Sequence, residues 1–216
     1  DQPMFNRAIR GRYPPGSTVK PFIGLAGLEY GLIDPNVSTY CQGWYMLDGD
    51  ERKYRDWKKQ GRGHTDMDDA IEQSCDVYFY ELAERLKIDR ISSYLDGFGF
   101  GRLTDIDIRG EQPGLLQSRA WKRKNKQMPW FPGETLITGI GQGFNLVTPI
   151  QLAASTAALS VKGRRQQPRM VHATEEPDIS IREVLPPRGL QPVTLSEEDN
   201  WSHMIDAMKD VIHSLH

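Results

Sequence analysis

The sequence has no surplus of charge of either sign. Its 27 lysine and arginine residues nearly balance its 29 aspartate and glutamate residues, which leaves a formal net charge of −2 at pH 7. It also contains no basic stripe with interleaved aromatic residues, so the composition argues against a nucleic acid partner. The densest basic run, WKRKNKQ at 121–127, has no helical phase and is predicted to be a solvated loop.

Long apolar runs and an export signal are missing as well. No segment approaches the roughly 18 apolar residues that a membrane-spanning helix needs. The opening residues, DQPMFNRAIRG, lack the charged and apolar regions of a signal peptide. We expect that an anchor or address, if the protein has one, was removed before residue 1.

Cysteine is scarce, and only Cys41 and Cys75 occur. Two cysteines allow one disulfide, two metal ligands or two free thiols. Their number therefore leaves the redox compartment of the protein open.

The remaining composition indicates a globular protein. The 216 residues are 38% hydrophobic and 26% charged, which is enough to bury a core in one domain with at most a small appendage. Thr148 and Ser196 are predicted N-caps, and Asp76 can cap the helix that follows it. Helices are expected within 17–33, 65–75, 77–88, 148–163 and 196–214, and loops with short strands within 36–64, 95–136 and 163–195.

A serine and a lysine lie three residues apart at the start of the first expected helix. The run YPPGSTVKPF at 13–22 places Ser17 after a Pro-Pro-Gly break and Lys20 on the same helix face. To act as a base, Lys20 must be neutral, which requires its pKa to fall by roughly 2 to 3 from about 10.4 through burial or nearby cations. A bare SxxK pattern is expected about once by chance in such a chain, so alone it favours an ordinary helix start.

Three stretches match one protein family in order and spacing. Together they resemble the transpeptidase domain of class B penicillin-binding proteins, serine acyltransferases whose motifs are SxxK, an S-x-N type motif and a later K-[ST]-G. The segment CQGWYMLDGDERKYRDWKKQGRGH is most similar to the elongation-specific subfamily, penicillin-binding protein 2. The three stretches are FNRAIRGRYPPGSTVKPF at 5–22, AIEQSCDVYFYELA at 70–83 and PGETLITGIGQGFNLVTPIQLA at 132–153.

The resemblance assigns a role to each motif residue. Ser17 would attack the carbonyl of a D-alanyl-D-alanine stem peptide while Lys20 takes its proton, and an amine of a second stem would resolve the acyl-enzyme. Ser74 would pass a proton towards the leaving D-alanine, and Asp76 would hold Lys20 or the substrate by hydrogen bonds. The Ser17 backbone N–H would be one oxyanion donor, and β-lactams would acylate Ser17. Gly141, Gln142 and Gly143 are expected to shape the rim of the site.

The resemblance also implies a fold, partners and a location. The fold would be α/β (α+β), a penicillin-binding transpeptidase and serine β-lactamase-like architecture with an antiparallel sheet between helical layers. The function would be cross-linking of peptidoglycan during elongation, without a cofactor for catalysis. Implied partners are a membrane glycosyltransferase and scaffold proteins of the elongation complex. The full-length protein would lie at the periplasmic face of the bacterial inner membrane on a single N-terminal anchor.

Two departures from the family pattern matter. Asp76 stands where most relatives carry asparagine, and a carboxylate favours a charged Lys20 more than an amide does. No K-[ST]-G occurs, because Lys162 and Gly163 are adjacent without the hydroxyl residue. In the family that strand supplies the second oxyanion donor and binds the substrate carboxylate. We therefore expect 1–216 to be a partial transpeptidase domain, without the N-terminal anchor, the pedestal and the K-[ST]-G portion, and this chain alone to acylate poorly or not at all.

A second hypothesis concerns a metal. Cys41, Asp56, His64 and Cys75 lie within 35 residues and can surround a Zn²⁺ ion tetrahedrally. Some proteins of the resembled subfamily carry a structural zinc beside the active site. The place of His64 is open, because the loop GRGH can shift by two residues. A Cys41–Cys75 disulfide and two inert thiols are the alternatives.

Two other functions compete with transpeptidation. A serine β-lactamase shares SxxK but must activate a deacylating water, and no acidic residue can be placed for that work. A non-catalytic β-lactam sensor or interaction module keeps the fold without turnover. The missing K-[ST]-G makes this second rival serious for the chain itself.

Overall fold

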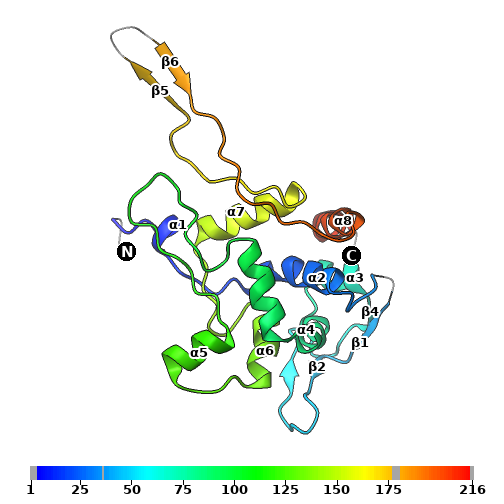
Figure 1. The fold of residues 1–216 in the computed structure, drawn as a ribbon. Coiled ribbons are helices and arrows are strands. Elements are labelled where there is room, and N and C mark those ends of the chain that lie inside the picture. Colours follow the sequence, from blue (N-terminus) through cyan, green and yellow to red (C-terminus); the bar gives the residue numbers. More distant parts are fainter. Residues whose placement is uncertain (1–3, 36, 177–180, 215–216) are drawn as a thin grey trace.

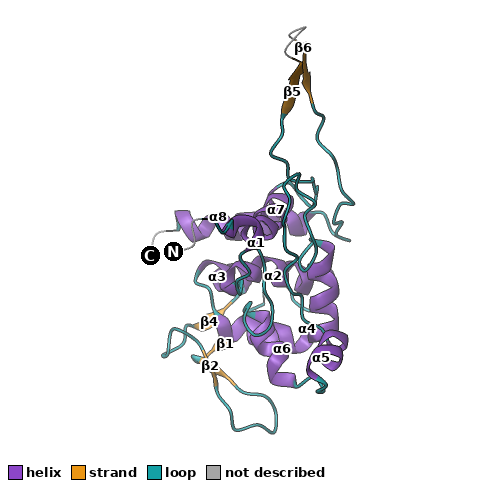
Figure 2. Ribbon diagram, turned by 90° about the vertical axis from the view of Figure 1, so that its left-hand side faces the viewer, coloured by secondary structure: helices purple, strands orange, loops and turns teal. Residues whose placement is uncertain are grey.

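In the computed structural model, residues 4–35, 37–176 and 181–214 are described. Figure 1 shows a helical body from which one hairpin projects, and Figure 2 shows the same hairpin from the side. The helices in these residues are α1 (Arg7–Arg10), the 3₁₀ turn η1 (Gly16–Val19), α2 (Lys20–Glu29), α3 (Met67–Glu72), α4 (Asp76–Gly97), α5 (Arg119–Lys126), α6 (Pro132–Gly139), α7 (Pro149–Ser160) and α8 (Asp199–His213).

The core is built around α2, which packs against α4 and α8. Both faces of α2 are apolar, and Phe22 and Ile23 are almost fully buried. Its two internal glycines allow close helix contacts. A Cβ atom on Gly24 would lie 2.7 Å from the Met204 side chain of α8, and one on Gly27 would lie 2.9 Å from Leu82 of α4. The gain in packing therefore outweighs the low helix propensity of glycine.

The strands pair antiparallel, as expected from the family fold. Within the described residues they form three separate two-stranded pairs rather than one continuous layer. The hairpin of β5 and β6 is the projection seen in Figure 1, and its strands lie inside the predicted loop region 163–195. The strands are β1 (Thr39–Cys41), β2 (Trp44–Tyr45), β3 (Tyr54–Arg55), β4 (Gly63–Thr65), β5 (Ala173–Glu176) and β6 (Ile181–Val184).

Local sequence signals placed the start of α7 correctly. Thr148 caps α7 as predicted, because its hydroxyl accepts the Gln151 N–H at 3.3 Å and the Gln151 side chain accepts the Thr148 N–H at 3.0 Å. The helix predicted for 77–88 is also present, and α4 departs from helical geometry at Lys87, where φ is 64°. Beyond that break the chain resumes a helical course to Gly97.

The predicted cap at Ser196 is wrong. Its N–H and hydroxyl both bind the Glu29 carboxylate at 2.8 Å, and α8 begins three residues later, at Asp199. Ser196 therefore ties the loop before α8 to the end of α2.

The loop predicted for 95–136 is also wrong in part, because α6 begins at Pro132 and most of the basic run at 121–127 forms α5. Ser118 caps this helix by accepting the Trp121 N–H at 3.1 Å. Lys122 is 2% exposed, binds the Glu134 carboxylate at 2.6 Å and lies 4.2 Å from the Phe131 ring centroid. A buried cation replaces the apolar stripe that helical periodicity relies on, so the sequence pattern did not reveal the helix.

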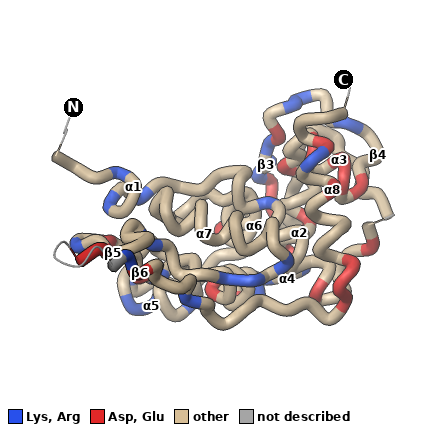
Figure 3. Tube along the Cα trace, turned by 90° about the horizontal axis from the view of Figure 1, so that it is seen from above, with Lys and Arg blue, Asp and Glu red and all other residues tan. Residues whose placement is uncertain are grey.

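Charged residues of both signs are interspersed along the trace in Figure 3. Among the residues that the structure describes, no helix is long and apolar enough to cross a membrane.

Candidate active site

Ser17 lies in η1, the short turn that leads directly into α2. Gly16 adopts a positive φ of 58°, and its N–H donates to the Gly141 carbonyl at 2.9 Å. Thr18 closes the turn by donating its hydroxyl to the Pro15 carbonyl at 2.7 Å. The Ser17 side chain is exposed, whereas Lys20, the first residue of α2, is 2% exposed. The turn therefore presents a serine to solvent above a buried lysine.

A chain of hydrogen bonds joins the four predicted catalytic residues. The Lys20 ammonium donates to the Ser74 hydroxyl at 3.0 Å and to the Asp76 carboxylate at 2.6 Å. The Ser74 hydroxyl donates to the Ser17 hydroxyl at 2.9 Å. The two motifs, 57 residues apart in the sequence, thus meet at a single point. Ser74 is the link between Ser17 and Lys20.

The surroundings of Lys20 lower the pKa of its ammonium group. Burial is the largest influence and lowers the Lys20 pKa, while the charge and hydrogen bond of Asp76 oppose it. The net result is a pKa below the ordinary lysine value. The Phe79 ring, whose centroid lies 5.4 Å from the Lys20 nitrogen, forms part of this enclosure. A lysine of this kind is suited to act as a general base.

Ser74 has a strained backbone at the junction of α3 and α4. Its φ is 53°, in the left-handed region that residues with a Cβ atom rarely adopt. Its carbonyl accepts from the Lys20 ammonium at 3.0 Å and from the Trp57 indole at 3.3 Å. These bonds hold the strained turn, which aims the hydroxyl at both Ser17 and Lys20. Strain of this type is concentrated at functional sites.

Asp56 caps the helix that carries Asp76. One of its oxygens accepts the Asp76 N–H at 2.7 Å and the Val77 N–H at 3.2 Å. Its other oxygen accepts the Lys58 N–H at 2.9 Å and the Arg62 guanidinium at 2.8 Å. The predicted cap, Asp76, is instead the first residue of α4. Sequence reasoning missed this role of Asp56 because the capping residue comes from 20 positions earlier in the chain.

Three of the four predicted metal ligands do come together. The ligand atoms of Cys41, Asp56 and Cys75 all lie within 4.8 Å of one another, and all three residues are buried. Burial raises the pKa of the Cys75 thiol to about 12.

The structure does not bring His64 to this cluster. Pairing of β1 with β4 sets Cys41 opposite Gly63 and Tyr40 opposite His64. Side chains alternate along a strand, so His64 shares the outer face with Tyr40 while Cys41 points inwards. The His64 ring is exposed, contacts Tyr40 and lies 3.3 Å from the Ser38 hydroxyl. The fourth predicted ligand is therefore excluded by strand register.

Arg62, two residues before His64, takes the fourth place. Its side chain is 3% exposed, and its guanidinium lies 2.8 Å from the Asp56 carboxylate and 3.9 Å from the Cys41 sulfur. A Zn²⁺ ion would need a fourth donor here and would meet a fixed positive charge instead. The described residues therefore do not fit zinc. The two-residue uncertainty in the GRGH loop was the sequence signal for Arg62.

The rim residues contact the turn that presents the nucleophile. Gly141 has a φ of 71°, and a Cβ atom added to it would lie 2.1 Å from the Gly16 carbonyl oxygen. Only glycine permits this approach. The tight turn at 141–143 thus sets the position of the residue before Ser17, which supports its predicted role at the rim.

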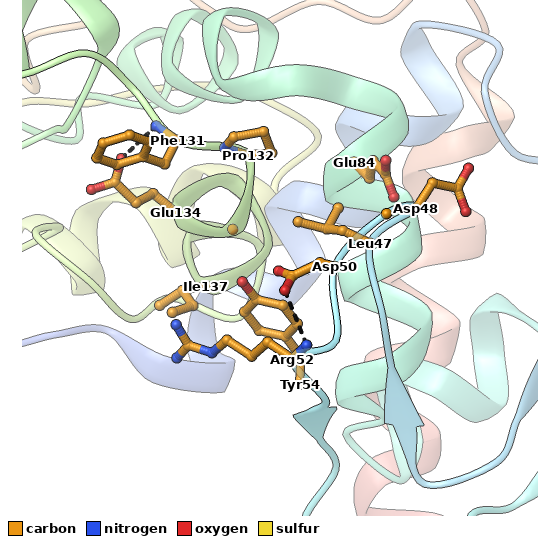
Figure 4. Close-up of a pocket in the computed structure, with 12 residues that line it drawn as sticks. Leu47, Asp48, Asp50, Arg52, Tyr54, Glu84, Phe131, Pro132, Glu134 and Ile137 are labelled. Atoms are coloured by element: carbon orange, nitrogen blue, oxygen red, sulfur yellow. Dashed lines mark hydrogen bonds between the residues drawn. The ribbon is translucent and has the colours of Figure 1, made fainter.

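A separate hollow lies between the β2–β3 loop and the start of α6, as Figure 4 shows. It has a volume of about 550 Å³, and Arg52, Tyr54, Phe131 and Ile137 are among its lining residues. None of the four predicted catalytic residues lines it. The case for a functional site therefore rests on the hydrogen-bonded chain at Ser17.

Sequence comparison settles the family. The family model described as the penicillin binding protein transpeptidase domain matches residues 1–214. This chain belongs to that family. The family requires no catalytic cofactor.

Curated transpeptidases are similar over most of this chain. The peptidoglycan D,D-transpeptidase MrdA of Acinetobacter baumannii is 41% identical over 215 residues, which are 99% of this chain and 32% of that protein. MrdA of Escherichia coli K12 is 40% identical over 174 residues, 81% of this chain and 28% of that protein. The chain thus spans about a third of the length of the curated relatives it matches.

Solved structures of penicillin-binding proteins share the fold. Pseudomonas aeruginosa PBP2 in complex with WCK 5153 has a TM-score of 0.89 at 41% identity, over 98% of this chain and 47% of that one. Helicobacter pylori PBP2, in complex with MreC, has a TM-score of 0.86 at 32% identity, over 98% of this chain and 37% of that one. These neighbours confirm the penicillin-binding transpeptidase fold and the expected likeness to penicillin-binding protein 2.

Proposed function

We propose that the protein is a peptidoglycan D,D-transpeptidase that cross-links cell-wall stem peptides during elongation through a serine acyl-enzyme. The observation that carries this proposal is the continuous hydrogen-bonded chain from Ser17 through Ser74 to Lys20 and Asp76. An exposed hydroxyl linked to a buried lysine of lowered pKa is the arrangement that activates a serine.

In the proposed acylation, the Ser17 oxygen attacks the carbonyl carbon of the terminal D-alanyl-D-alanine bond. Its proton passes to neutral Lys20, and the Ser74 hydroxyl bridges the two groups because it lies 2.9 Å from Ser17 and 3.0 Å from Lys20. Ser74 then returns a proton to the amine of the leaving D-alanine. An amine of a second stem peptide attacks the acyl-enzyme, which forms the cross-link and frees Ser17. β-Lactams would acylate the same oxygen.

Asp76 raises the pKa of Lys20 and so makes loss of its proton harder. Its carboxylate lies 2.6 Å from the Lys20 nitrogen, and its charge raises the lysine pKa against the effect of burial. We infer that Asp76 both positions Lys20 and sets the pH above which the site is active.

We also propose that residues 1–216 form part of a larger transpeptidase domain. The chain contains no K-[ST]-G motif, and it spans 32% of the A. baumannii relative. The second oxyanion donor and the binding group for the substrate carboxylate would come from the strand that carries that motif. The full protein would work at the periplasmic face of the inner membrane on an N-terminal anchor.

The proposed partners are scaffold proteins and a membrane glycosyltransferase of the elongation machinery. The support is the complex of H. pylori PBP2 with MreC. A further structure, described as structural coordination of polymerization and crosslinking by a peptidoglycan synthase complex, has a TM-score of 0.81 at 29% identity.

Intact mass after exposure to a penicillin, followed over time, tests the function. The full-length protein is expected to gain one stable adduct, and Ser17→Ala is expected to gain none. Rapid loss of the adduct would indicate a β-lactamase, and no adduct in the full-length protein would indicate a binding module. A stable adduct without cross-linking of stem peptides would indicate a sensor. Each of these three results contradicts the proposal.

A further inference from the structure

The two cysteines of this protein meet in a buried cluster next to the catalytic residues. Cys41 ends β1, Cys75 separates Ser74 from Asp76, and the two sulfur atoms lie 3.3 Å apart. Cys41 is 1% exposed and Cys75 is 0% exposed. Two thiols from distant parts of the chain are thus held in contact at the junction that presents Ser74.

Asp56 and Arg62, which lie beside the thiols, bind each other and nearby backbone groups. The Asp56 carboxylate accepts four hydrogen bonds, two on each oxygen, so no lone pair is left pointing at an ion. Arg62 balances that charge. Its guanidinium also donates to the Gln73 carbonyl at 3.0 Å and lies 4.9 Å from the Trp57 ring centroid. An organic cation thus fills the place where a metal would be needed.

We propose that Cys41 and Cys75 form a disulfide site, with Arg62 as the resident cation of the cluster in place of a metal ion. The proposal does not depend on the reactivity of Ser17, so it can fail or succeed separately from the proposed function.

The proposed reaction is thiol–disulfide exchange with a small disulfide or a protein disulfide as oxidant. The oxidant's S–S bond breaks as one cysteine sulfur attacks it, and the second cysteine then displaces the oxidant's remaining thiol. The Cys41–Cys75 S–S bond forms, both cysteine S–H bonds are lost, and the oxidant leaves as two thiols that carry the two protons and two electrons. Because both sulfurs are buried, we expect exchange during folding or local opening.

The geometry needs only a small adjustment. A disulfide bond is about 2.05 Å long, so the sulfurs, 3.3 Å apart, must approach by about 1.2 Å through side-chain rotation. The bond would close a loop that contains β2, β3, β4 and α3. It would anchor β1 to the residue between Ser74 and Asp76, and so limit the motion of the junction that aims the Ser74 hydroxyl.

The test measures thiols and zinc on the same protein. Reduced full-length protein is equilibrated anaerobically with mixtures of reduced and oxidised glutathione, in a low urea concentration that permits local opening. It is then acid-quenched, unfolded and alkylated, and its mass is determined. We expect both cysteines to lose their reactivity together as the oxidised fraction rises, with a thermal midpoint about 5 to 10 °C higher in the oxidised form.

Two variants sharpen the test. Cys41→Ser has one cysteine of the pair and should show no cooperative loss and no rise in midpoint on oxidation. Arg62→His exchanges the cation for a neutral ligand, and it should retain zinc through gel filtration where the wild-type protein retains none. If Cys41→Ser does not fold, the oxidised and reduced wild-type forms carry the comparison.

Three results would overturn the proposal. The first is full alkylation of both cysteines in every glutathione mixture. The second is a mixed disulfide with glutathione that does not resolve to the internal bond. The third is one zinc ion bound per wild-type chain. In addition, equal zinc content in the wild-type protein and Arg62→His would contradict the role assigned to Arg62.

Discussion

Replacing Asp56 by asparagine should destabilise the protein far more than an ordinary substitution. The Asp56 side chain is fully buried and pairs with Arg62, whose side chain is 3% exposed. Asparagine has nearly the same shape as aspartate, but its NH₂ group would replace one of the two oxygens that now accept hydrogen bonds. A donor would then face donors. It would also leave the Arg62 charge buried without its counter-ion. Removing one partner of a buried ion pair lowers the free energy of unfolding by about 3 to 5 kcal/mol.

This cost already includes the loss of the helix cap, because the same carboxylate serves both roles and the effects are not additive. Each kcal/mol shifts the thermal midpoint of a chain of this size by about 2 to 4 °C, so we expect a fall of about 6 to 20 °C. Urea denaturation followed by circular dichroism measures the free energy of unfolding directly. Asp50→Asn is the matched control, because Asp50 is exposed and accepts one hydrogen bond, from the Arg52 N–H.

The pH dependence provides a second check on Asp56. Burial raises the pKa of this carboxyl, but hydrogen bonds from Arg62, Lys58 and Val77 outweigh it and hold the pKa below its usual range. The folded pKa is therefore below the unfolded value of about 3.9. The stabilisation is present above about pH 3.9 and is lost as the pH falls through the folded pKa, so wild type and Asp56→Asn should converge in acid. Two results would refute the reasoning. One is a loss of less than about 1 kcal/mol in the free energy of unfolding of Asp56→Asn at pH 7. The other is a difference in unfolding free energy between wild type and variant that stays constant as the pH falls.

Three further substitutions test the site in the full-length protein. Asp76→Asn removes the charge that opposes burial, so the Lys20 pKa falls further and the acidic limb of penicillin acylation against pH should move down by about 1 to 2 pH units; an unmoved limb contradicts this. Ser74→Ala should slow acylation by about 10²-fold or more at unchanged thermal stability, and a rate within about threefold of wild type would remove Ser74 from the proton path. Gly141→Ala should cost about 1 to 3 kcal/mol more than Gly49→Ala in urea denaturation, because both have positive φ but only the first would place a Cβ atom against backbone, at 2.1 Å; equal losses would mean that the contact is unimportant.

Local chemistry explains why parts of this fold could be predicted. Thr148 and Gln151 are three residues apart and satisfy each other's backbone N–H groups, so their pattern is visible in any short window. The apolar run of α2 likewise identifies a buried helix without knowledge of its partners. The motif residues Ser17, Lys20 and Ser74 were named from order and spacing, and the structure joins them by hydrogen bonds.

Long-range contacts explain what could not be predicted. Lys122 makes α5 a helix with a buried face only because Glu134 and Phe131 lie beside it, so no helical pattern of apolar residues occurs there. Serine is a common N-cap residue, but the folded chain brings the Glu29 carboxylate to Ser196, whose hydroxyl binds it instead of capping α8.

At the predicted metal site, the sequence identified the candidate ligands, but only the fold decided which side chains meet. The sequence identified Cys41, Asp56, His64 and Cys75 as candidate zinc ligands, because these soft or borderline side chains lie within 35 residues and Cys75 is inside the second motif. Strand register turns His64 outwards opposite Tyr40, and the turn before β4, where Gly61 and Gly63 both have positive φ, turns Arg62 towards the cluster. Strand pairing and the conformation of this turn both depend on the folded chain, so folding was needed to place a guanidinium, rather than an imidazole, beside the two thiols.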